Sequence, residues 1–131
     1  MSKRRGVLEK EVQRQIEAEI GAEPDFLLMK NSVGVAKYFD DNGKQFVVPY
    51  GVGGPGAPDL IGILRLTVAG VEAGICVCLE VKADEGELEP DQKKCHAAFR
   101  RFGAIVETVR SAAEARAALE RARAMFKAVQ A

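Results

Sequence analysis

The segment ICVCLEVK, residues 75–82, decides the fold, because its pattern predicts a strand that is covered on both faces. Its odd positions are all aliphatic, while its even positions begin with two cysteines and end with Glu80 and Lys82. Near-continuous apolar character is typical of a central strand with helices on both sides. Charge enters on one face only where the strand leaves the core, and we expect a functional site at that point.

A neighbouring strand brings a second carboxylate to the same place. It is predicted over residues 60–67, directly after Asp59, and a turn is expected over residues 68–74. Glu80 and Lys82 are two positions apart, so on a strand they point to the same face, and a paired strand lies only about 4.8 Å away. If the two strands pair as a hairpin, Asp59 and Glu80 meet at one edge of the sheet, close enough to share one cation.

Helices and further strands surround this pair. The strongest hairpin signal is Asp-Asp-Asn-Gly at residues 40–43, and a Ser-x-x-Glu capping box begins at Ser111. We expect frayed residues at 1–6, helices at 7–21, at 90–102 and from the capping box to the C-terminus, strands at 26–30 and 104–109, and hairpin strands at 33–39 and 45–49. This order predicts an α/β/α sandwich on a mixed β-sheet, in one domain spanning residues 1–131.

The helix over residues 90–102 is predicted to turn one side toward the sheet. Cys95, Phe99 and Phe102 share that side, and Gln92 lies on it one turn earlier. His96 is predicted to face solvent, since it stands in a polar part of the helix.

Composition excludes several classes of protein. The 131 residues are 47% hydrophobic and 29% charged, with a formal net charge of zero, which argues against a binder that acts by bulk positive charge. No apolar run reaches the ~18–20 residues of a membrane helix and no signal pattern opens the chain, so we expect a cytoplasmic protein with no membrane partner. Three cysteines without a Cys-x-x-Cys pair, and a single histidine, argue against a zinc site.

The expected carboxylate pair suits a hard divalent cation. Mg²⁺ is commonly held by one or two carboxylates, with retained waters and substrate phosphate oxygens completing its octahedron. Such an ion lowers the pKa of a bound water and polarises a phosphate, and Lys82 beside it would balance the developing negative charge. Each piece alone has a simpler explanation, since Glu-x-Lys can be a surface ion pair and Pro-Asp commonly starts a turn.

Two longer stretches carry a resemblance to a known family. GGPGAPDLIGIL, residues 53–64, and CLEVKADEGELEPDQKKCHAAFRRFGAIVETVRS, residues 78–111, resemble the VRR-NUC branch of the PD-(D/E)XK nuclease superfamily. The resemblance extends from Glu9 to about Ser111. It implies a restriction-endonuclease-like core and DNA cleavage with Mg²⁺ or Mn²⁺. It also implies selection of branched substrates, such as Holliday junctions or flaps, and a possible homodimer.

The resemblance also implies roles for individual residues. Asp59 and Glu80 fall on the family's metal ligands, Lys82 falls on its catalytic lysine, and Val81 would offer a backbone carbonyl to the metal. Supporting catalytic positions fall on Gln92 and on Glu9, with Glu11 as an alternative to Glu9, and contacts to DNA are expected from Lys30, Asn31, Ser32, Lys93 and Lys94. For Glu9, Asn31 and Gln92, a packing or capping role is the alternative.

We therefore expect a Mg²⁺- or Mn²⁺-dependent endodeoxyribonuclease that acts on branched DNA. One alternative is a catalytically silent nucleic-acid-binding or assembly module with the same fold, although such a module has no reason to keep all of Asp59, Glu80 and Lys82. Another is a Mg²⁺ enzyme of small phosphate esters, although the Gly-rich segment 51–56 lacks the Gly-Lys-Ser/Thr of a P-loop.

Overall fold

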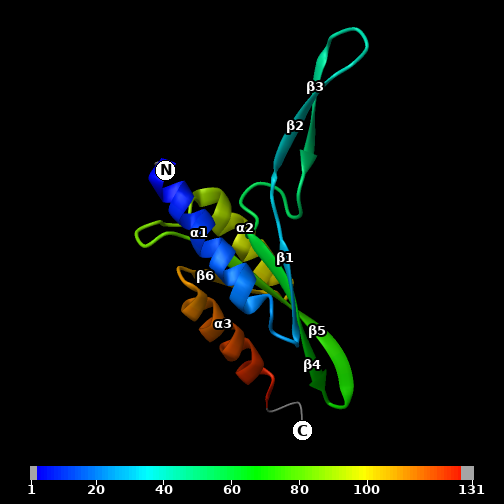
Figure 1. Cartoon of the computed structure of the whole chain (residues 1–131). Helices are drawn as coiled ribbons and strands as arrows, with labels where there is room; N and C mark the ends of the chain where they lie inside the picture. Colours follow the sequence, from blue (N-terminus) through cyan, green and yellow to red (C-terminus); the bar gives the residue numbers. More distant parts are fainter. Residues whose placement is uncertain (1–2, 128–131) are drawn as a thin grey trace.

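Strand β5 runs through the middle of a mixed sheet, as its apolar pattern predicts (Figure 1). The computed structural model describes residues 3–127. The elements in chain order are α1 (Lys3–Ile20), β1 (Phe26–Lys30), β2 (Gly34–Phe39), β3 (Gln45–Tyr50), β4 (Leu60–Val68), β5 (Val71–Val81), α2 (Pro90–Arg101), β6 (Ile105–Val109) and α3 (Ala112–Met125). No helix among these is long and apolar enough to cross a membrane.

The sheet has the strand order β1-β4-β5-β6. β4 pairs antiparallel with both β1 and β5, whereas β6 lies parallel to β5. The parallel pair needs a crossover, and helix α2 supplies it between β5 and β6. The predicted order of elements and the α/β/α sandwich on a mixed sheet are confirmed.

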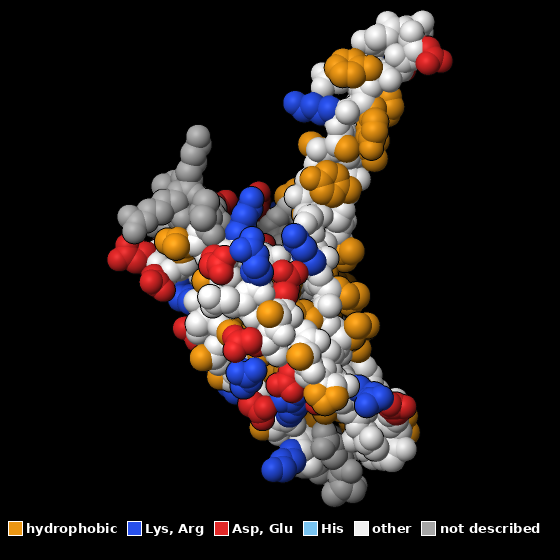
Figure 2. Space-filling model, viewed as in Figure 1, with side chains coloured by type: hydrophobic (Ala, Val, Ile, Leu, Met, Phe, Trp, Pro, Cys, Tyr) orange, Lys and Arg blue, Asp and Glu red, His pale blue; other side chains and the backbone are white. Residues whose placement is uncertain are grey.

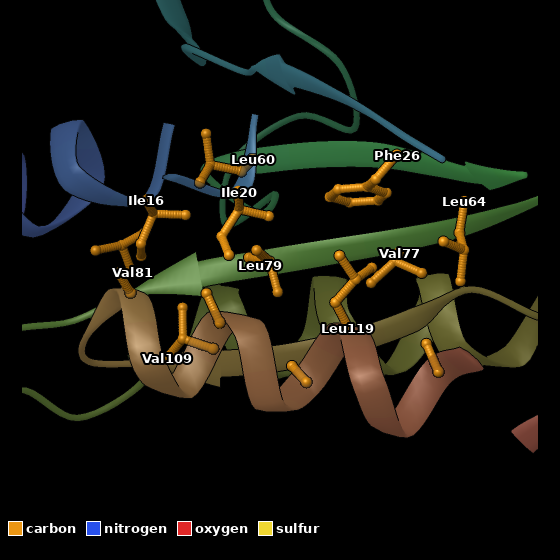
Figure 3. Close-up of a cluster of buried hydrophobic side chains, with 14 of the residues drawn as sticks. Ile16, Ile20, Phe26, Leu60, Leu64, Val77, Leu79, Val81, Val109 and Leu119 are labelled. Carbon is orange, nitrogen blue, oxygen red and sulfur yellow. The ribbon is translucent and has the colours of Figure 1, made fainter. Parts of the chain in front are cut away.

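The main hydrophobic core lies between the sheet and helices α1 and α3 (Figure 3). Alternate residues of β5, including Val77 and Leu79, point into it and meet Ile16 and Ile20 of α1 and Leu119 of α3. Residues one position away, such as Cys78 and Glu80, face the opposite side, where helix α2 packs beside β6. Strand β5 is therefore buried on both faces at its C-terminal end.

The turn between β4 and β5 is much shorter than predicted. Strand β5 begins at Val71, directly after a two-residue turn, so the expected turn over residues 68–74 is wrong. Ala69 and Gly70 both have positive φ, 51° and 80°, which is the twist that suits a tight hairpin. Alanine rarely adopts this conformation, and the sequence therefore gave a weak turn signal.

The β2–β3 hairpin stands away from the body of the molecule as a separate two-stranded sheet (Figure 1). Its turn is organised by Asp40, whose Oδ1 accepts hydrogen bonds from the backbone N–H groups of Asn42 and Lys44, at 2.9 and 2.8 Å. Most side chains of β2 and every side chain of β3 are exposed. We call residues 34–50 the arm.

Helix boundaries differ from the predictions at both ends of the chain. Helix α1 already begins at Lys3, so the frayed segment predicted over residues 1–6 is wrong for residues 3–6, while residues 1 and 2 lie outside the described part. The last helix ends at Met125, and its predicted extension beyond residue 127 also lies outside that part. Phe102 was expected to face the sheet, but it is the C-cap residue of α2 and 86% of it is exposed.

Candidate active site

Asp59 and Glu80 meet at one edge of the sheet. In the antiparallel pairing of β4 with β5, Leu60 lies opposite Leu79, and one further step along this register sets Asp59 opposite Glu80. The Oδ2 atom of Asp59 accepts a hydrogen bond of 2.8 Å from the backbone N–H of Val81. The strand pairing thus holds both carboxylates where the sequence placed them.

Glu80 is a carboxyl group inside the protein, with only 1% of its surface exposed. Its Oε1 atom lies 3.0 Å from Nε2 of His96 on helix α2. Burial and then the neighbouring Asp59 carboxyl raise the pKa of Glu80 well above its usual range. Two carboxyl groups held this close favour either a shared proton or a bound cation.

His96 is completely buried, so the prediction that it faces solvent is wrong. Burial and then the positive charge of Arg100 lower the pKa of His96. Helical position alone did not reveal this, because the residue packs toward Glu80, whose place beneath α2 depends on the folded sheet. A buried carboxylate needs a partner, and only that requirement could have identified His96 from the sequence.

Lys82 continues the same face of β5 and is only 4% exposed. It lines a pocket of about 370 Å³ together with Glu9 of α1 and the acidic loop at residues 85–90. Glu9 reaches this pocket from α1, and its Oε1 atom lies 3.5 Å from the backbone N–H of Ala83. Lys82 is thus a nearly buried cation within an acidic pocket.

Asp59 opens to a second, larger pocket of about 540 Å³. One wall belongs to α1 and contains Lys10 and Arg14 together with the acidic Glu17. The other wall follows β1 and contains Lys30, Asn31 and Ser32, which the sequence placed near the site. Lys10 and Arg14 were not singled out, because their basic charge faces the site only when α1 lies across the end of the sheet. We call this pocket the basic groove.

Other residues named from the sequence form structural contacts. The Oε1 atom of Gln92 accepts a hydrogen bond of 2.9 Å from the backbone N–H of Glu89 and so caps helix α2. Asn31 bridges two loops, because its side chain donates to the carbonyl oxygens of Val52 and Pro58 and accepts from the Val52 N–H. This bridge supports the turn immediately before Asp59.

Three further residues named from the sequence lie at the surface. Glu11 is paired with Arg14, its Oε2 atom lying 2.8 Å from Nη1 of that arginine. Lys93 and Lys94 are exposed on helix α2, and neither of them lines the basic groove.

The donor set fits a hard divalent cation, although it is sparse. Within residues 3–127, no group of three or more His, Cys, Asp and Glu side chains could hold a metal. A metal here would therefore depend on Asp59, Glu80 and a backbone carbonyl, with water and substrate oxygens as the remaining ligands, which is the way proteins usually hold Mg²⁺. The buried Glu80 carboxyl beside Asp59 is the observation that favours a cation at this position.

A comparison with known protein families gives one match. The model of the VRR-NUC domain family matches residues 43–113, just over half of the chain, and the match includes Asp59, Glu80 and Lys82. Glu9 and the α1 wall of the basic groove lie outside the matched segment. No curated protein and no solved structure matches the chain. The fold, the site and this match together show that the chain belongs to the VRR-NUC domain family of nucleases.

Proposed function

We propose that this protein is a Mg²⁺- or Mn²⁺-dependent endodeoxyribonuclease. The observation that carries the proposal is the convergence of Asp59, Glu80 and Lys82 at the end of a strand that is otherwise apolar. Charged side chains are rarely buried unless they are paired or hold a metal, and two of these three are almost fully buried.

Each residue of the site has a distinct role in this proposal. Asp59 and Glu80 would hold the ion, with the backbone carbonyl of Val81 as a third ligand. When bound, the ion supplies Lewis-acid polarisation of the phosphate and a lowered pKa for coordinated water. The ammonium group of Lys82 would stabilise the negative charge that develops on the phosphate oxygens. Glu9 shares a pocket with Lys82 and would orient the ammonium group or the attacking water.

Two substitutions test the assignment without disturbing the backbone. Asp59→Asn removes the charge but keeps an oxygen that can accept from the Val81 N–H, and Lys82→Met removes the ammonium group but keeps an unbranched side chain at an almost buried position. We expect both variants to unfold like the wild type and to lose metal-dependent cleavage of plasmid DNA. Glu72→Gln, at an exposed carboxylate of β5, is the matched control and should cleave normally. Retained cleavage in both site variants would refute the assignment.

A titration with Mn²⁺ separates this proposal from the catalytically silent alternative. Binding of the ion to the folded chain alone should raise the midpoint of thermal unfolding, because a ligand of the native state stabilises it. The Asp59→Asn variant should show a smaller rise. If the wild-type chain is not stabilised by Mn²⁺ and cleaves no DNA, the silent binding module becomes the better explanation.

The basic groove is the proposed path of the DNA backbone. Lys10, Arg14 and Lys30 surround the opening above Asp59 and would neutralise phosphates on either side of the scissile bond. DNA binding should be measured in the Asp59→Asn background, where no cleavage occurs. For Lys10→Gln and Lys30→Gln, we expect the slope of log K against log salt to decrease by about 0.9 each. Lys44→Gln, at the turn of the arm, should leave the slope unchanged.

A homodimer is the second part of the proposal, and the arm supports it. Figure 2 shows hydrophobic side chains along the arm and on the adjoining side of the body. An isolated two-stranded hairpin is at best marginally stable in water, so such a surface calls for a partner. Ala36, Tyr38, Phe46, Val48 and Tyr50 share one face of the hairpin, and Tyr38 stacks on Phe46 with ring centroids 5.7 Å apart.

A second copy of the chain fits the arm better than DNA does. The arm carries two lysines and two aspartates, so it has no net charge to attract phosphates. The open side of β1 and β4 exposes a matching apolar patch at Leu27, Met29 and Ile63. In a two-fold dimer, each copy can offer its arm to the patch of the other, so that both apolar surfaces are covered.

Light scattering tests the dimer directly. We expect a mass near twice 14.1 kDa for the wild type, and Phe46→Ser should shift it toward the monomer. Phe102→Ser is the control, because Phe102 is an equally bulky side chain exposed elsewhere on the surface. A single 14.1 kDa species at every concentration would remove the dimer from the proposal.

Selectivity for branched DNA follows from the dimer. Two sites related by a two-fold axis match the two equivalent strands of a four-way junction, whereas a flap has no such pair of equivalent strands. The test compares cleavage of a junction, a flap and a linear duplex under the same conditions. Equal rates on all three substrates would end the structure-selective version and leave the nuclease assignment standing.

A further inference from the structure

His96 is a fully buried polar side chain that has no role in the proposed chemistry so far. It is the only histidine of the chain, and it lies on α2 with its ring against the end of β5. Its Nε2 atom is 3.0 Å from Oε1 of Glu80. Its Nδ1 atom is also buried and has no hydrogen-bond partner among the described residues.

The two ring nitrogens have different surroundings, and this difference selects one tautomer. A neutral imidazole carries one N–H donor and one acceptor nitrogen. With a cation bound, Glu80 is a carboxylate that can only accept, so in that state the hydrogen belongs on Nε2. Nδ1 is then a bare lone pair, which costs less in an unpartnered position than a buried N–H would. His96 therefore donates one hydrogen bond, and Glu80 receives it.

That hydrogen bond fixes a side chain that would otherwise rotate. Glutamate has three side-chain torsions, and Glu80 leaves its strand toward the α2 side, where His96 holds one of its two oxygens. The other oxygen of Glu80 is then available to a cation beside Asp59, which lies opposite Glu80 across the strand pair. Outer partners of this kind orient metal-binding carboxylates, and their loss commonly weakens metal binding by about 10- to 100-fold.

We propose that His96 is the positioning residue of the metal site. Its Nε2–H holds Oε1 of Glu80, so that the remaining oxygen faces the ion beside Asp59. The inference rests on the proposed metal site at Asp59 and Glu80, and it makes helix α2 part of that site. A histidine that merely filled space behind the sheet would be replaceable by any side chain of similar volume.

Two substitutions distinguish positioning from filling. In His96→Gln the side-chain amide can place an N–H donor close to the present position of Nε2, whereas His96→Leu fills a similar volume and has no donor. Both variants and the wild type are compared by calorimetric titration of the DNA-free chain with Mn²⁺. Thermal unfolding without metal checks that each variant is folded. His96→Met replaces His96→Leu if the latter does not fold, because methionine adapts to irregular space.

The expected result is a loss of Mn²⁺ affinity in His96→Leu of about 10- to 100-fold, with affinity in His96→Gln within a few-fold of the wild type. Equal affinity in wild type and His96→Leu would overturn the inference while leaving the metal site intact. Equal losses in folded His96→Gln and His96→Leu would overturn it too, because the hydrogen bond would then not matter. If the wild type binds no Mn²⁺, both the metal site and this inference fail.

Discussion

Substitution of Gly62 by alanine should destabilise the fold strongly, because the added methyl group would overlap a buried aromatic ring. Gly62 lies in the middle of β4, opposite Leu28 of β1 and Val77 of β5. A Cβ atom built on this glycine would lie 2.0 Å from Cζ and 2.3 Å from Cε1 of Phe26. The ring of Phe26 is only 4% exposed, so it has no free direction in which to move.

The magnitude follows from two limits. If the core adjusts around the extra methyl group, overpacking costs about 1–3 kcal/mol. If the ring leaves the core, the cost approaches the roughly 3–5 kcal/mol of a Phe→Ala change. Replacing glycine also reduces the conformational entropy of the unfolded chain, which returns about 0.4–1 kcal/mol to the free energy of unfolding. We therefore expect Gly62→Ala to lower the free energy of unfolding by about 2–3 kcal/mol.

Urea unfolding followed by circular dichroism measures this change. Gly74→Ala is the matched control, because its new Cβ would meet only Cγ2 of Ile63, an exposed side chain that can turn away into solvent. In the double variant Gly62→Ala/Phe26→Leu the ring is gone, so the two changes should be less harmful together than their sum, by at least about 1 kcal/mol. Strict additivity, or a loss below about 0.5 kcal/mol in Gly62→Ala, would refute the reasoning.

Three further predictions concern links between elements. Arg123→Ala removes hydrogen bonds of 2.9 and 2.6 Å to Asp25, and it should lower the free energy of unfolding by about 1 kcal/mol at neutral pH. In the wild type, Arg123 lowers the pKa of Asp25. Because the folded-state pKa is lowered, this contribution is complete above pH 3.8 and disappears as the pH falls further, so urea midpoints of variant and wild type should converge in acid. Arg110→Ala frees the carbonyl of Ala83, which accepts at 2.6 Å, and should speed cleavage of the following acidic loop by a glutamate-specific protease. Asn31→Ala should lower the free energy of unfolding by about 1–3 kcal/mol, measured in urea, and weaken Mn²⁺ binding by loosening the turn before Asp59.

Local signals in the sequence predicted most of the fold. Strand and helix periods, the Asp-Asp-Asn-Gly turn and the Ser111 cap each depend on neighbouring residues, and all of these elements are present. The failures occurred where a local signal was weak or ambiguous. Ala69 adopts a conformation that alanine seldom takes. Helix α2 ends at Arg101, so Phe102 does not continue its inward-facing side.

Long-range packing decided the features that local sequence signals did not predict. Hairpin signals at residues 40–43 are the same whether the hairpin packs on the core or projects from it, so the arm could not be foreseen. His96 is buried because the Glu80 carboxyl lies beneath its helix. The contact of Gln92 with Glu89 is local, and it agrees with the capping role that was the stated alternative for Gln92. By contrast, Asp59 and Glu80 were placed together correctly, because an antiparallel pair of adjacent strands has few possible registers.

The site and the core depend on the same strand register. A slip of one residue between β4 and β5 would turn the apolar side chains of one strand to the opposite face and would also move Asp59 away from Glu80. The ring of Phe26 against Gly62 helps to fix that register three residues from Asp59, because only glycine leaves room for the ring at this position of β4. Damage to this contact should therefore weaken Mn²⁺ binding as well as the fold, even though neither residue touches the site. A stabilising change elsewhere in the core should restore the free energy of unfolding of Gly62→Ala without restoring its metal affinity.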